Sequence, residues 1–443
     1  MNESIWYDTE IEKRPQAQGK LKTQVIIVGG GIAGITAAYK LSQNNIDVIL
    51  LEARRIVHGV TGNTTGKITA QHDLIYGKLS RKSSETAKLY AESNQTAIEE
   101  YAKIIKEENI DCDFVREHAN IYTTDPNSVQ TLEKEFAKAL ESGLDALITL
   151  ENSLPFKTCA CYRINNQARF HPLKYLRRLA ELSEKNGVKI YENSRVLEIS
   201  NHEVYTKEAI IKGEHIIVAT HYPIINTPGY YFTRMYQHRS CAIALKGVPP
   251  IDGMYLSYEQ DGKSFRMQKD LLILGGADYK TGTEGKKNHY EMLEHFASEH
   301  YTNYTIESAW SAQDCITLDG LPYIGHYSGK LPDIYVLTGF AKWGMTLSMV
   351  GSMLITDLIL GKNNPWEELY SPKRAIGGKA ILKGSGMGLS SAGHLTAGLF
   401  SHHKCPHMGC KLTYNAEEFT WDCPCHGSRM TRKGEIIDAP AIL

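Results

Sequence analysis

The sequence has 443 residues, a formal net charge of −1 and an apolar content of 42%. This length predicts two or three domains, and the composition is typical of globular proteins. The near-zero net charge provides no field for binding nucleic acid or anionic lipid. The N-terminus lacks the apolar core of a signal peptide, and the longest apolar stretch, Met345–Gly361, is short and contains Asp357. We therefore expect a cytoplasmic protein with no membrane span and no nucleic-acid partner.

The first motif that carries chemistry follows a polar segment, residues 1–22, which we expect to form a surface arm. Val25–Val28 is a short apolar run typical of a strand buried on both faces. Three glycines follow it in G-x-G-x-x-G spacing: Gly29, Gly31 and Gly34. In that order they permit a tight turn, let the backbone approach a pyrophosphate and let the following helix pack on the strand. The free N–H groups of that helix would bind phosphate.

A second apolar run, Val48–Leu51, ends in Glu52, whose carboxylate is placed to bind ribose hydroxyls. Strand, helix, second strand and acid together favour a dinucleotide site over an ordinary βαβ unit with a glycine turn. The Gly-, Thr- and Asn-rich residues after Glu52 could offer donors to the cofactor, among them Thr61 and Thr65, or form a simple connection. His58 and His72 lie there too, and a covalent flavin link through either is conceivable.

The middle of the chain alternates helices and short strands. Amphipathic patterns predict helices over 79–108, 127–142 and Pro172–Lys185. Short strands are expected at Lys189–Tyr191, Arg195–Ile199, Glu203–Tyr205, Ala209–Ile211 and His215–Thr220. A helix, a meander and an apolar strand ending in Ala-Thr are typical of the second half of a two-dinucleotide flavin domain.

The next region, Ser240–Tyr304, is rich in strands and turn glycines, and we expect it to form a β-sheet substrate domain. A strand at Ile334–Leu337 is followed by TGFAKWGMT, which opens an apolar helix. This strand-to-helix turn could direct the helix dipole at a cofactor carbonyl.

Residues 20–372 resemble the D-amino-acid oxidase and glycine oxidase superfamily of FAD enzymes. The matching pieces are the glycine fingerprint with Glu52, VATHYP, DGLPYIG and TGFAKWGMT. The resemblance implies that Val196 lies by the adenine. It also implies that five residues lie along the flavin ring: Gly339, Trp343, Gly344, Met345 and Thr346. The expected fold is a doubly wound α/β FAD domain with an inserted α+β substrate domain. The FAD pieces would be about 1–88, 150–237 and 305–372, and the substrate pieces about 89–149 and 238–304.

The sequence departs from this superfamily before Asp319-Gly320. Members similar to glycine oxidase carry an arginine there that holds the substrate carboxylate, whereas this chain has Gln313-Asp314-Cys315. Arg234, Arg239 or Arg266 could replace it, although each is more commonly a surface arginine. The catalytic candidates are therefore Asp314, Arg266 and Trp343.

The C-terminal residues 373–443 form a separate module that contains four of the nine cysteines. A stretch rich in turn-forming residues between Gly377 and Gly393 precedes two short cysteine–histidine motifs, or boxes, CPHMGC and CPCHGS. They supply Cys405 and His407, then Cys423 and His426. Without a secretion signal, such a cluster favours metal binding over a disulfide framework.

The two boxes resemble those of Rieske proteins, in which two thiolates bind one iron of a [2Fe–2S] cluster and two imidazoles bind the other. A tetrahedral zinc site is the alternative for two cysteines and two histidines. The resemblance implies that the remaining cysteines, Cys410 and Cys425, form the loop-tying disulfide of cytochrome bc-type Rieske proteins. The module is expected to be small and all-β.

The whole chain resembles bacterial FAD-dependent oxidoreductases with a C-terminal Rieske domain. The expected activity is oxidation of a C–N bond in an amine or amino acid, with hydride passing to the flavin. Electrons would then leave singly through the cluster to a one-electron acceptor protein or a quinone. Two alternatives remain open: a reductase in which the cluster feeds the flavin, and a redox sensor without enzymatic activity.

Overall fold

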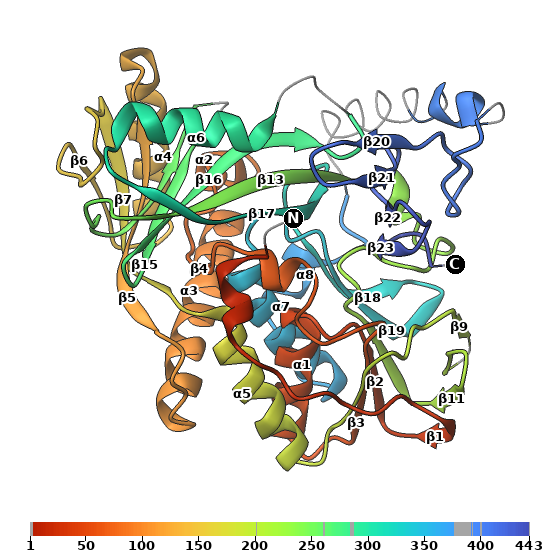
Figure 1. Ribbon diagram of the computed structural model, residues 1–443. Helices are drawn as coiled ribbons and strands as arrows, with labels where there is room; N and C mark the ends of the chain where they lie inside the picture. The colour runs from red at the N-terminus through yellow and green to blue at the C-terminus, as the bar shows by residue number, and fades with distance from the viewer. Residues whose placement is uncertain are drawn as a thin grey trace.

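The computed structural model describes residues 3–200, 202–259, 262–283, 288–375, 391, 393–398 and 401–442. These residues form two large sheets and two small four-stranded sheets (Figure 1). The turn-rich stretch predicted between Gly377 and Gly393 lies almost entirely outside the described residues. No helix in the described part of the chain is both long and apolar enough to cross a bilayer.

A six-stranded sheet forms the lower half of the molecule in Figure 1. Its strands, in spatial order, are β18 (Tyr323–Ser328), β19 (Leu331–Thr338), β12 (His215–Val218), β2 (Val25–Val28), β3 (Val48–Leu51) and β8 (Lys189–Tyr191). All neighbours are parallel except β18 and β19. Every residue of β2 and β3 is buried, as the apolar runs predict for central strands covered on both faces.

Three helices cover one face of this sheet. They are α1 (Ile32–Ser42), α5 (Pro172–Lys185) and α7 (Gly344–Ile359). The predicted helix Pro172–Lys185 is confirmed to the residue. Ala33 in α1 and Ser352 in α7 are hydrogen-bonded, so small side chains let these two helices approach closely.

A larger antiparallel-rich sheet lies above the first (Figure 1). Its order is β17 (Thr305–Thr317), β13 (Met235–Lys246), β16 (Leu271–Lys280), β15 (Ser264–Gln268), β14 (Met254–Ser257), β5 (Val115–Thr123), β7 (Ala160–Arg169) and β4 (Lys67–Ile68), with β6 (Ala146–Thr149) on β7. Strands β7 and β17 therefore belong to this sheet, which reaches into the sequence pieces 150–237 and 305–372. We call it the substrate sheet.

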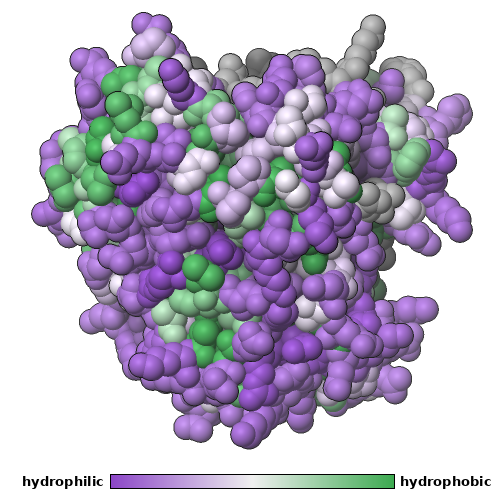
Figure 2. All heavy atoms as spheres, turned by 60° about the vertical axis from the view of Figure 1, so that its left-hand side comes forward, coloured by the Kyte–Doolittle hydropathy of each residue, from purple (hydrophilic) through white to green (hydrophobic). Residues whose placement is uncertain are grey.

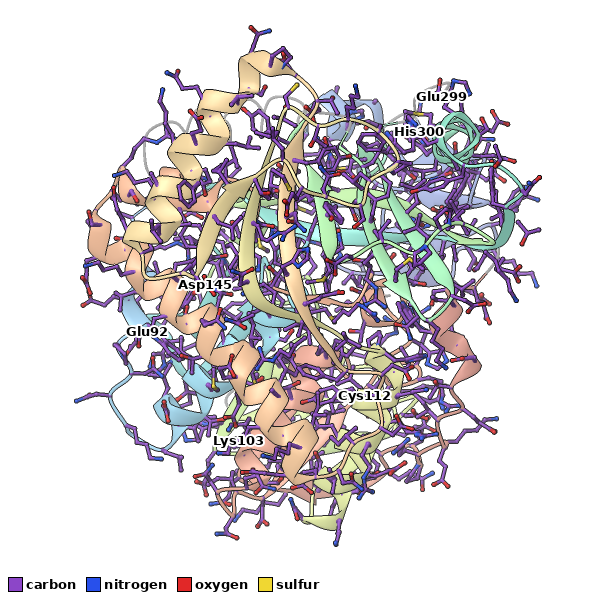
Figure 3. The ribbon with its side chains drawn as sticks, turned by 90° about the vertical axis from the view of Figure 1, so that its left-hand side faces the viewer. Glu92, Lys103, Cys112, Asp145, Glu299 and His300 are labelled. Carbon is purple, nitrogen blue, oxygen red and sulfur yellow. A yellow bond between two sulfur atoms is a disulfide. The ribbon has the colours of Figure 1, made fainter. Side chains whose placement is uncertain are left out.

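Helices pack on both faces of the substrate sheet. They are α2 (Ile75–Ser80), α3 (Ser84–Glu107), α4 (Val129–Glu141) and α6 (His289–His300); α8 (Glu367–Tyr370) follows α7. Figure 3 shows α3 crossing in front of the sheet, with Glu92 and Lys103 on it. The predicted helix over 79–108 is broken at residues 81–83, where the Ser83 side chain accepts a hydrogen bond from the Thr86 N–H and caps α3. This face is mostly hydrophilic, with separate hydrophobic patches (Figure 2).

The expectation of a surface arm over residues 1–22 is wrong. Trp6 has no exposed surface, and its indole N–H donates to the Thr64 carbonyl at 2.7 Å. Arg14 is also buried and pairs with Glu184 at 2.8 Å. The polar composition concealed these anchors, because single large side chains can fix a segment that has no apolar periodicity. The segment ends as β1 (Gly19–Lys22) in a small sheet with β11 (Ala209–Lys212), β10 (Glu203–Tyr205) and β9 (Glu198–Ser200).

The C-terminal module is the all-β unit that the sequence predicts. Its four antiparallel strands are β20 (Thr413–Asn415), β21 (Thr420–Asp422), β22 (Arg429–Thr431) and β23 (Ile436–Asp438). Figure 1 shows them at the upper right, beside the ends of β13 and β17.

Candidate flavin and iron–sulfur sites

A long cavity runs between the two large sheets. One wall comes from the β2–α1 turn and the loop after β3, and the opposite wall comes from β13, β16 and β17. The loop before α7 closes one end, and residues of the C-terminal module contribute to the lining. Crevices at the carboxyl ends of parallel strands are where open α/β sheets bind their ligands.

The glycines of the β2–α1 turn have distinct surroundings. Gly29 has φ +112°, and a Cβ there would lie 2.4 Å from the Ala219 carbonyl oxygen. A Cβ at Gly34 would lie 1.9 Å from the Gly29 carbonyl oxygen, so any side chain there would force helix and strand apart. Gly31 differs, because its Cβ would meet only the Thr61 hydroxyl, at 3.2 Å. The backbone at Gly31 is therefore open to a ligand on the cavity side.

The first turn of α1 is suited to a diphosphate. The N-cap Gly31 has no side chain and therefore cannot cap this positive helix end itself. Of the N–H groups in the first turn, that of Ile32 donates to the Thr61 hydroxyl at 3.0 Å. Glu52 stands beside this turn and accepts hydrogen bonds from the backbone N–H groups of Gly30 and Arg54, both at 2.8 Å. These donors orient its carboxylate at the place expected for ribose, so the residues fit a dinucleotide such as FAD.

The structure brings most of the predicted cofactor residues together. Those that line the cavity are Gly29, Gly31, Glu52, Thr61, Thr65, Val196, Trp343, Gly344 and Met345. The other three lie behind this lining. Gly34 packs against the turn, and Gly339 has φ +73° with the Thr317 methyl group close by. Thr346 accepts a hydrogen bond from the Thr69 N–H and donates one to the Thr69 carbonyl, both at 2.9 Å.

His72 is buried beside the loop before α7. Its ring stacks on Trp343 with centroids 4.6 Å apart, and its Nδ1 lies 2.6 Å from the Tyr90 hydroxyl. Burial lowers the pKa of His72 to about 3. The residue therefore supports Trp343 as a neutral ring. His58 lines the cavity, with its Nδ1 at 2.8 Å from the Ile56 carbonyl.

The wall formed by the substrate sheet carries a compact charged group. Asp278 on β16 forms an ion pair with Lys342, and both line the cavity. Asp314 on β17 lines the same region and is 9% exposed. Burial raises the pKa of Asp314 to about 7; Lys342 opposes this shift and Asp278 adds to it. The wall thus holds two carboxyl groups and one ammonium group.

The arginines considered as substitutes for the missing carboxylate-binding arginine do not line the cavity. Arg266 is fully buried and donates to the carbonyls of Gly66 and Phe170 at 3.0 and 3.3 Å. Arg234 donates to the Pro372 and Gly229 carbonyls. Arg239 pairs with a glutamate of the C-terminal module. Each guanidinium is therefore committed to the protein itself.

A second lysine of the cavity was not anticipated from the sequence. Lys67 on β4 donates to the Tyr255 carbonyl and to the Ser264 hydroxyl, both at 2.9 Å. Burial, reinforced by nearby Arg266, lowers the pKa of Lys67 to about 7.

The two boxes of the C-terminal module converge as the Rieske spacing predicts. The rings of His407 and His426 face each other edge to face with centroids 5.0 Å apart. Cys405 and Cys423 are both buried outside any disulfide, and their thiol groups contact each other. The Cys410–Cys425 disulfide ties the two loops, and its sulfur atoms lie within 4.8 Å of the Cys423 sulfur.

The ring nitrogens of the histidines show how this site could hold metal. The Nδ1 atoms of His407 and His426 are both buried, and neither has a hydrogen-bond partner among the described residues. Buried polar atoms are rarely left unsatisfied, so these two atoms and the two free thiols fit a metal group between the loops. The Nε2 of His407 is already engaged, at 2.8 Å from the Asn226 side-chain oxygen.

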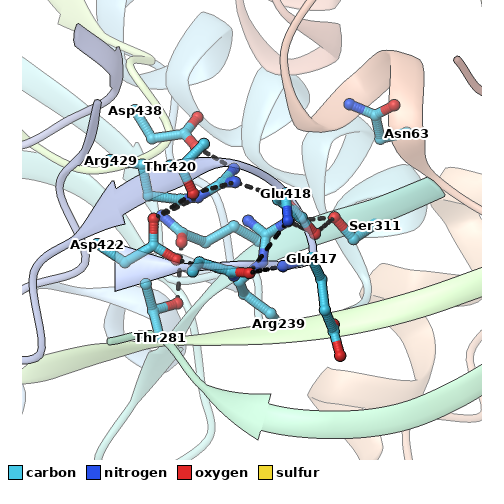
Figure 4. A network of polar contacts seen from close by, with 12 residues as sticks. Asn63, Arg239, Thr281, Ser311, Glu417, Glu418, Thr420, Asp422, Arg429 and Asp438 are labelled. Carbon is cyan, nitrogen blue, oxygen red and sulfur yellow. Dashed lines mark hydrogen bonds and ion pairs between the residues drawn. The ribbon is translucent and has the colours of Figure 1, made fainter. Parts of the chain in front are cut away.

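The C-terminal module is fastened to the substrate sheet by a buried ionic network (Figure 4). Glu418 pairs with Arg239 of β13 and Arg429 of β22. Arg429 also contacts Asp422 at 3.2 Å and Asp438 at 3.1 Å. Burial opposes ionisation of Glu418, but the two guanidinium groups hold its pKa at about 2. The network places β23 and the residues after it against the cavity, where Ile437, Asp438, Ala439 and Ile442 belong to the lining.

These features define a flavin-dependent oxidoreductase fold joined to a Rieske-type cluster domain. The family model for FAD dependent oxidoreductases (DAO) matches residues 24–358, and the model for the Rieske [2Fe-2S] domain matches residues 395–442. The chain therefore belongs to the DAO family of FAD-dependent oxidoreductases and carries a C-terminal Rieske domain. Its cofactors are FAD and a [2Fe–2S] cluster.

Among curated relatives, the putative Rieske 2Fe-2S iron-sulfur protein YhfW of Bacillus subtilis (strain 168) is 36% identical, over 99% of this chain and 96% of the relative. The gamma-glutamylputrescine oxidoreductase of Escherichia coli (strain K12) is 22% identical, over 76% of this chain and 83% of its own length.

Two solved structures show the same fold. Glycine oxidase from Geobacillus kaustophilus superposes with a TM-score of 0.67 at 18% identity, over 81% of this chain and all of that one. L-proline dehydrogenase from P. horikoshii has a TM-score of 0.66 at 20% identity, over 80% of this chain and 98% of that one.

Proposed function

We propose that this protein is a dehydrogenase that oxidises a C–N bond of an amine or amino acid and passes the electrons singly through its cluster to an external acceptor. The names of gamma-glutamylputrescine oxidoreductase, L-proline dehydrogenase and glycine oxidase favour a C–N substrate. The observation that carries the electron-transfer part is the contact of the cluster module with the cavity, whose lining includes Asp438 and Ala439.

The predicted cofactor residues are assigned to particular parts of FAD or of the cluster. The turn at Gly29 and Gly31 would hold the diphosphate and Glu52 the ribose, while Val196 would lie by the adenine. The loop from Trp343 to Thr346 would lie along the flavin ring. Cys405 and Cys423 would bind one iron, and the two histidines the other. The proposed domain boundary follows residue 372, and the substrate domain comprises about residues 89–149 and 238–304, which are joined in space by the pairing of β5 with β14.

When bound, FAD accepts two electrons as a hydride and the cluster carries one electron at a time. Oxidation of an amine C–N bond to an imine releases one hydride and one proton. Two successive one-electron transfers to an external acceptor then balance each turnover. The residues of this chain bind and orient the substrate, and the apolar lining near Trp310 and Trp343 excludes water.

We propose further that the preferred substrate is a cationic amine without an α-carboxylate. Support comes from Asp314 and Asp278 on the substrate wall, and from the three arginines that are committed elsewhere. Like charges brought together in a confined site cost several kcal/mol, so carboxylates near the site disfavour a substrate carboxylate. Lys342 is paired with Asp278, which reduces its availability as a carboxylate anchor.

The test is anaerobic mixing of the purified protein with a panel of amines and amino acids while flavin absorbance is followed. A cationic amine should bleach the flavin faster than glycine or D-alanine does. Glycine or D-alanine turnover far above that of every amine would refute the substrate class. Absence of bleaching by any member would favour a reductase or a sensor.

Cluster variants test the electron route. Cys405→Ser should lose the cluster, yet substrate should still bleach the flavin in a single turnover. Steady-state turnover with a one-electron acceptor should collapse. His407→Cys should retain at most an altered cluster of lower potential, because a charged thiolate replaces a neutral imidazole. Unchanged flavin reoxidation by the acceptor in His407→Cys would show that the cluster is not the exit route.

A further inference from the structure

The two ligand histidines have different surroundings. His426 is 6% exposed; its backbone carbonyl accepts a hydrogen bond from Gln237 of the substrate sheet, and its ring meets Phe232 of the β12–β13 loop edge to face at 5.7 Å. His407 is only half-buried, and the residues on either side of it, Pro406 and Met408, are exposed. One histidine thus lies in a buried loop that the substrate sheet holds through its backbone, and the other lies at the molecular surface.

The inner histidine rests on a pair of buried amides. Gln237 of β13 donates to the His426 carbonyl at 2.7 Å and to the Ala439 carbonyl at 3.1 Å. Gln313 of β17 donates to the Gly427 carbonyl at 2.9 Å and also to the side-chain oxygen of Gln237. Both glutamines are 2% exposed. They therefore hold the second cluster loop directly on two strands of the substrate sheet.

This glutamine pair lies one residue away from the cavity. Asp314, next to Gln313, lines the cavity, and it is paired in register with His238, next to Gln237. Successive side chains of a strand point to opposite faces, so the glutamines face the C-terminal module while Asp314 faces the cavity. The second cluster loop packs tightly on Gln237, since a Cβ at Gly427 would lie 2.6 Å from the Gln237 Cβ.

The outer histidine lies where two surface loops meet. The hydrogen bond from His407 reaches Asn226, an exposed residue of the loop between β12 and β13. Each loop carries an exposed large hydrophobic side chain: Met408 at 39% and Tyr230 at 54%. Apolar groups around a cluster edge are suited to the small, transient contacts of electron-transfer proteins.

The charges of these two loops share one sign. Residues 221–235 and 401–414 contain no aspartate or glutamate, and the second loop includes the exposed Lys404 and Lys411. A basic rim attracts a partner with an acidic face and accelerates its association.

We propose that the two histidines divide electron transfer: His426 on the Gln237–Gln313 pair exchanges electrons with the flavin part, and the surface at His407, Met408 and Tyr230 docks an acidic one-electron carrier protein. The glutamines are positioning residues. The proposal rests on the pairing of flavin and cluster proposed above, and it holds for either direction of electron flow.

The inner contact is tested with Gln313→Leu, which retains the size but not the hydrogen bonds. Flavin and cluster absorbance are followed after laser-flash photoreduction of the full-length holoprotein, so no substrate is required. Exchange between flavin and cluster should slow at least tenfold, while oxidation of the reduced protein by plant plastocyanin, an acidic one-electron acceptor, stays unchanged. If Gln313→Leu lacks the cluster EPR signal, Gln313→Asn replaces it. Unchanged exchange in a variant with an intact signal would overturn the inner assignment.

The outer contact is tested with Met408→Glu, and with Phe419→Glu as the matched control. Phe419 is 53% exposed in the same module but lies in the β20–β21 turn. Met408→Glu should slow oxidation by plastocyanin at least tenfold and leave flavin–cluster exchange unchanged, and Phe419→Glu should change neither. The wild-type rate should also fall with added salt. Equal effects of the two substitutions, or faster oxidation by ubiquinone-1 than by plastocyanin, would overturn the outer assignment.

Discussion

The two walls of the cofactor cavity are built in different ways. The flavin wall comes mainly from one continuous stretch, residues 25–65, in which a strand, a glycine turn, a helix and an acid follow in fixed spacing. The substrate wall combines β13, β16 and β17 with the loop before α7, which lie far apart in the sequence. The cofactor is therefore encoded locally, whereas the substrate site depends on strand pairing over long sequence separations.

The different construction of the two walls has a functional consequence. A diphosphate is bound by backbone N–H groups, which depend on chain conformation rather than on particular side chains. A substrate is selected by a few polar side chains such as Asp278, Asp314 and Lys342, and neighbouring strands must bring these together. Relatives can therefore share the first wall and differ in the second.

The largest effect is expected for the glycine that joins strand and helix on the flavin wall. Gly34→Ala would place a Cβ 1.9 Å from the Gly29 carbonyl oxygen, so the turn must shift and most FAD should be lost. Gly31→Ala has only the Thr61 hydroxyl as neighbour, at 3.2 Å, and should retain the fold while binding FAD about tenfold more weakly. Flavin absorbance per protein measures both. Equal FAD content in both variants and wild type would refute the assignment of this wall.

The next largest effect concerns the module that completes the cavity. Glu418→Ala would leave Arg239 and Arg429 buried without their shared partner, which typically costs about 3–5 kcal/mol. The matched control is Glu417→Ala at the same turn, because among the described residues the Glu417 side chain contacts only the half-buried His289, through its backbone N–H at 2.7 Å and its ring at 3.0 Å. The urea midpoint should fall far more for Glu418→Ala. Similar midpoints in the two variants would show that the network does not anchor the module.

The contrast between the walls also explains what the sequence could predict. The strand Val25–Val28, the helix Pro172–Lys185 and the convergence of the two cysteine–histidine boxes follow from local spacing. Trp6 and Arg14 anchor a segment expected to be an arm, and local polarity could not reveal that.

Other parts of the site depend on pairings that no local pattern specifies. Gln237 and Gln313 look like ordinary polar strand residues until the strands pair and the cluster module docks on them. The same holds for the Asp278–Lys342 pair, whose members are joined only in the folded cavity. Asp314 did stand out, because it replaces an expected arginine.

On the substrate wall, Asp314→Asn removes a charge while retaining the shape of the side chain. If the site prefers cationic amines, the KM for the best amine should rise about tenfold, equivalent to about 1.4 kcal/mol, while flavin content stays the same. Asp252→Asn, at an exposed carboxyl group, serves as the control. An unchanged KM in Asp314→Asn would remove the electrostatic basis for amine selection.

The smallest effect expected is a pH dependence of the KM for a cationic amine, which follows from the ionisation of Asp314. Burial, with a contribution from Asp278, raises the pKa of Asp314 to about 7 against the opposing effect of Lys342. Asp314 is thus mostly neutral at pH 6 and mostly charged at pH 8, whereas an alkylamine stays protonated throughout, with a pKa of about 10. If the neutral form binds the amine about tenfold more weakly, as expected for Asp314→Asn, the KM for such an amine should fall about fivefold from pH 6 to pH 8.

Other titrating and charged groups near Asp314 determine how this pH profile is interpreted. Arg239 stays charged over this range, but His238, paired in register with Asp314, is a second ionisable side chain whose protonation would likewise disfavour a cation. The profile is therefore measured in wild type, Asp314→Asn and His238→Asn. If Asp314 is responsible, the profile becomes flat in Asp314→Asn and persists in His238→Asn. The opposite result would assign the pH dependence to His238 and leave the substrate wall without an ionisable selector at Asp314.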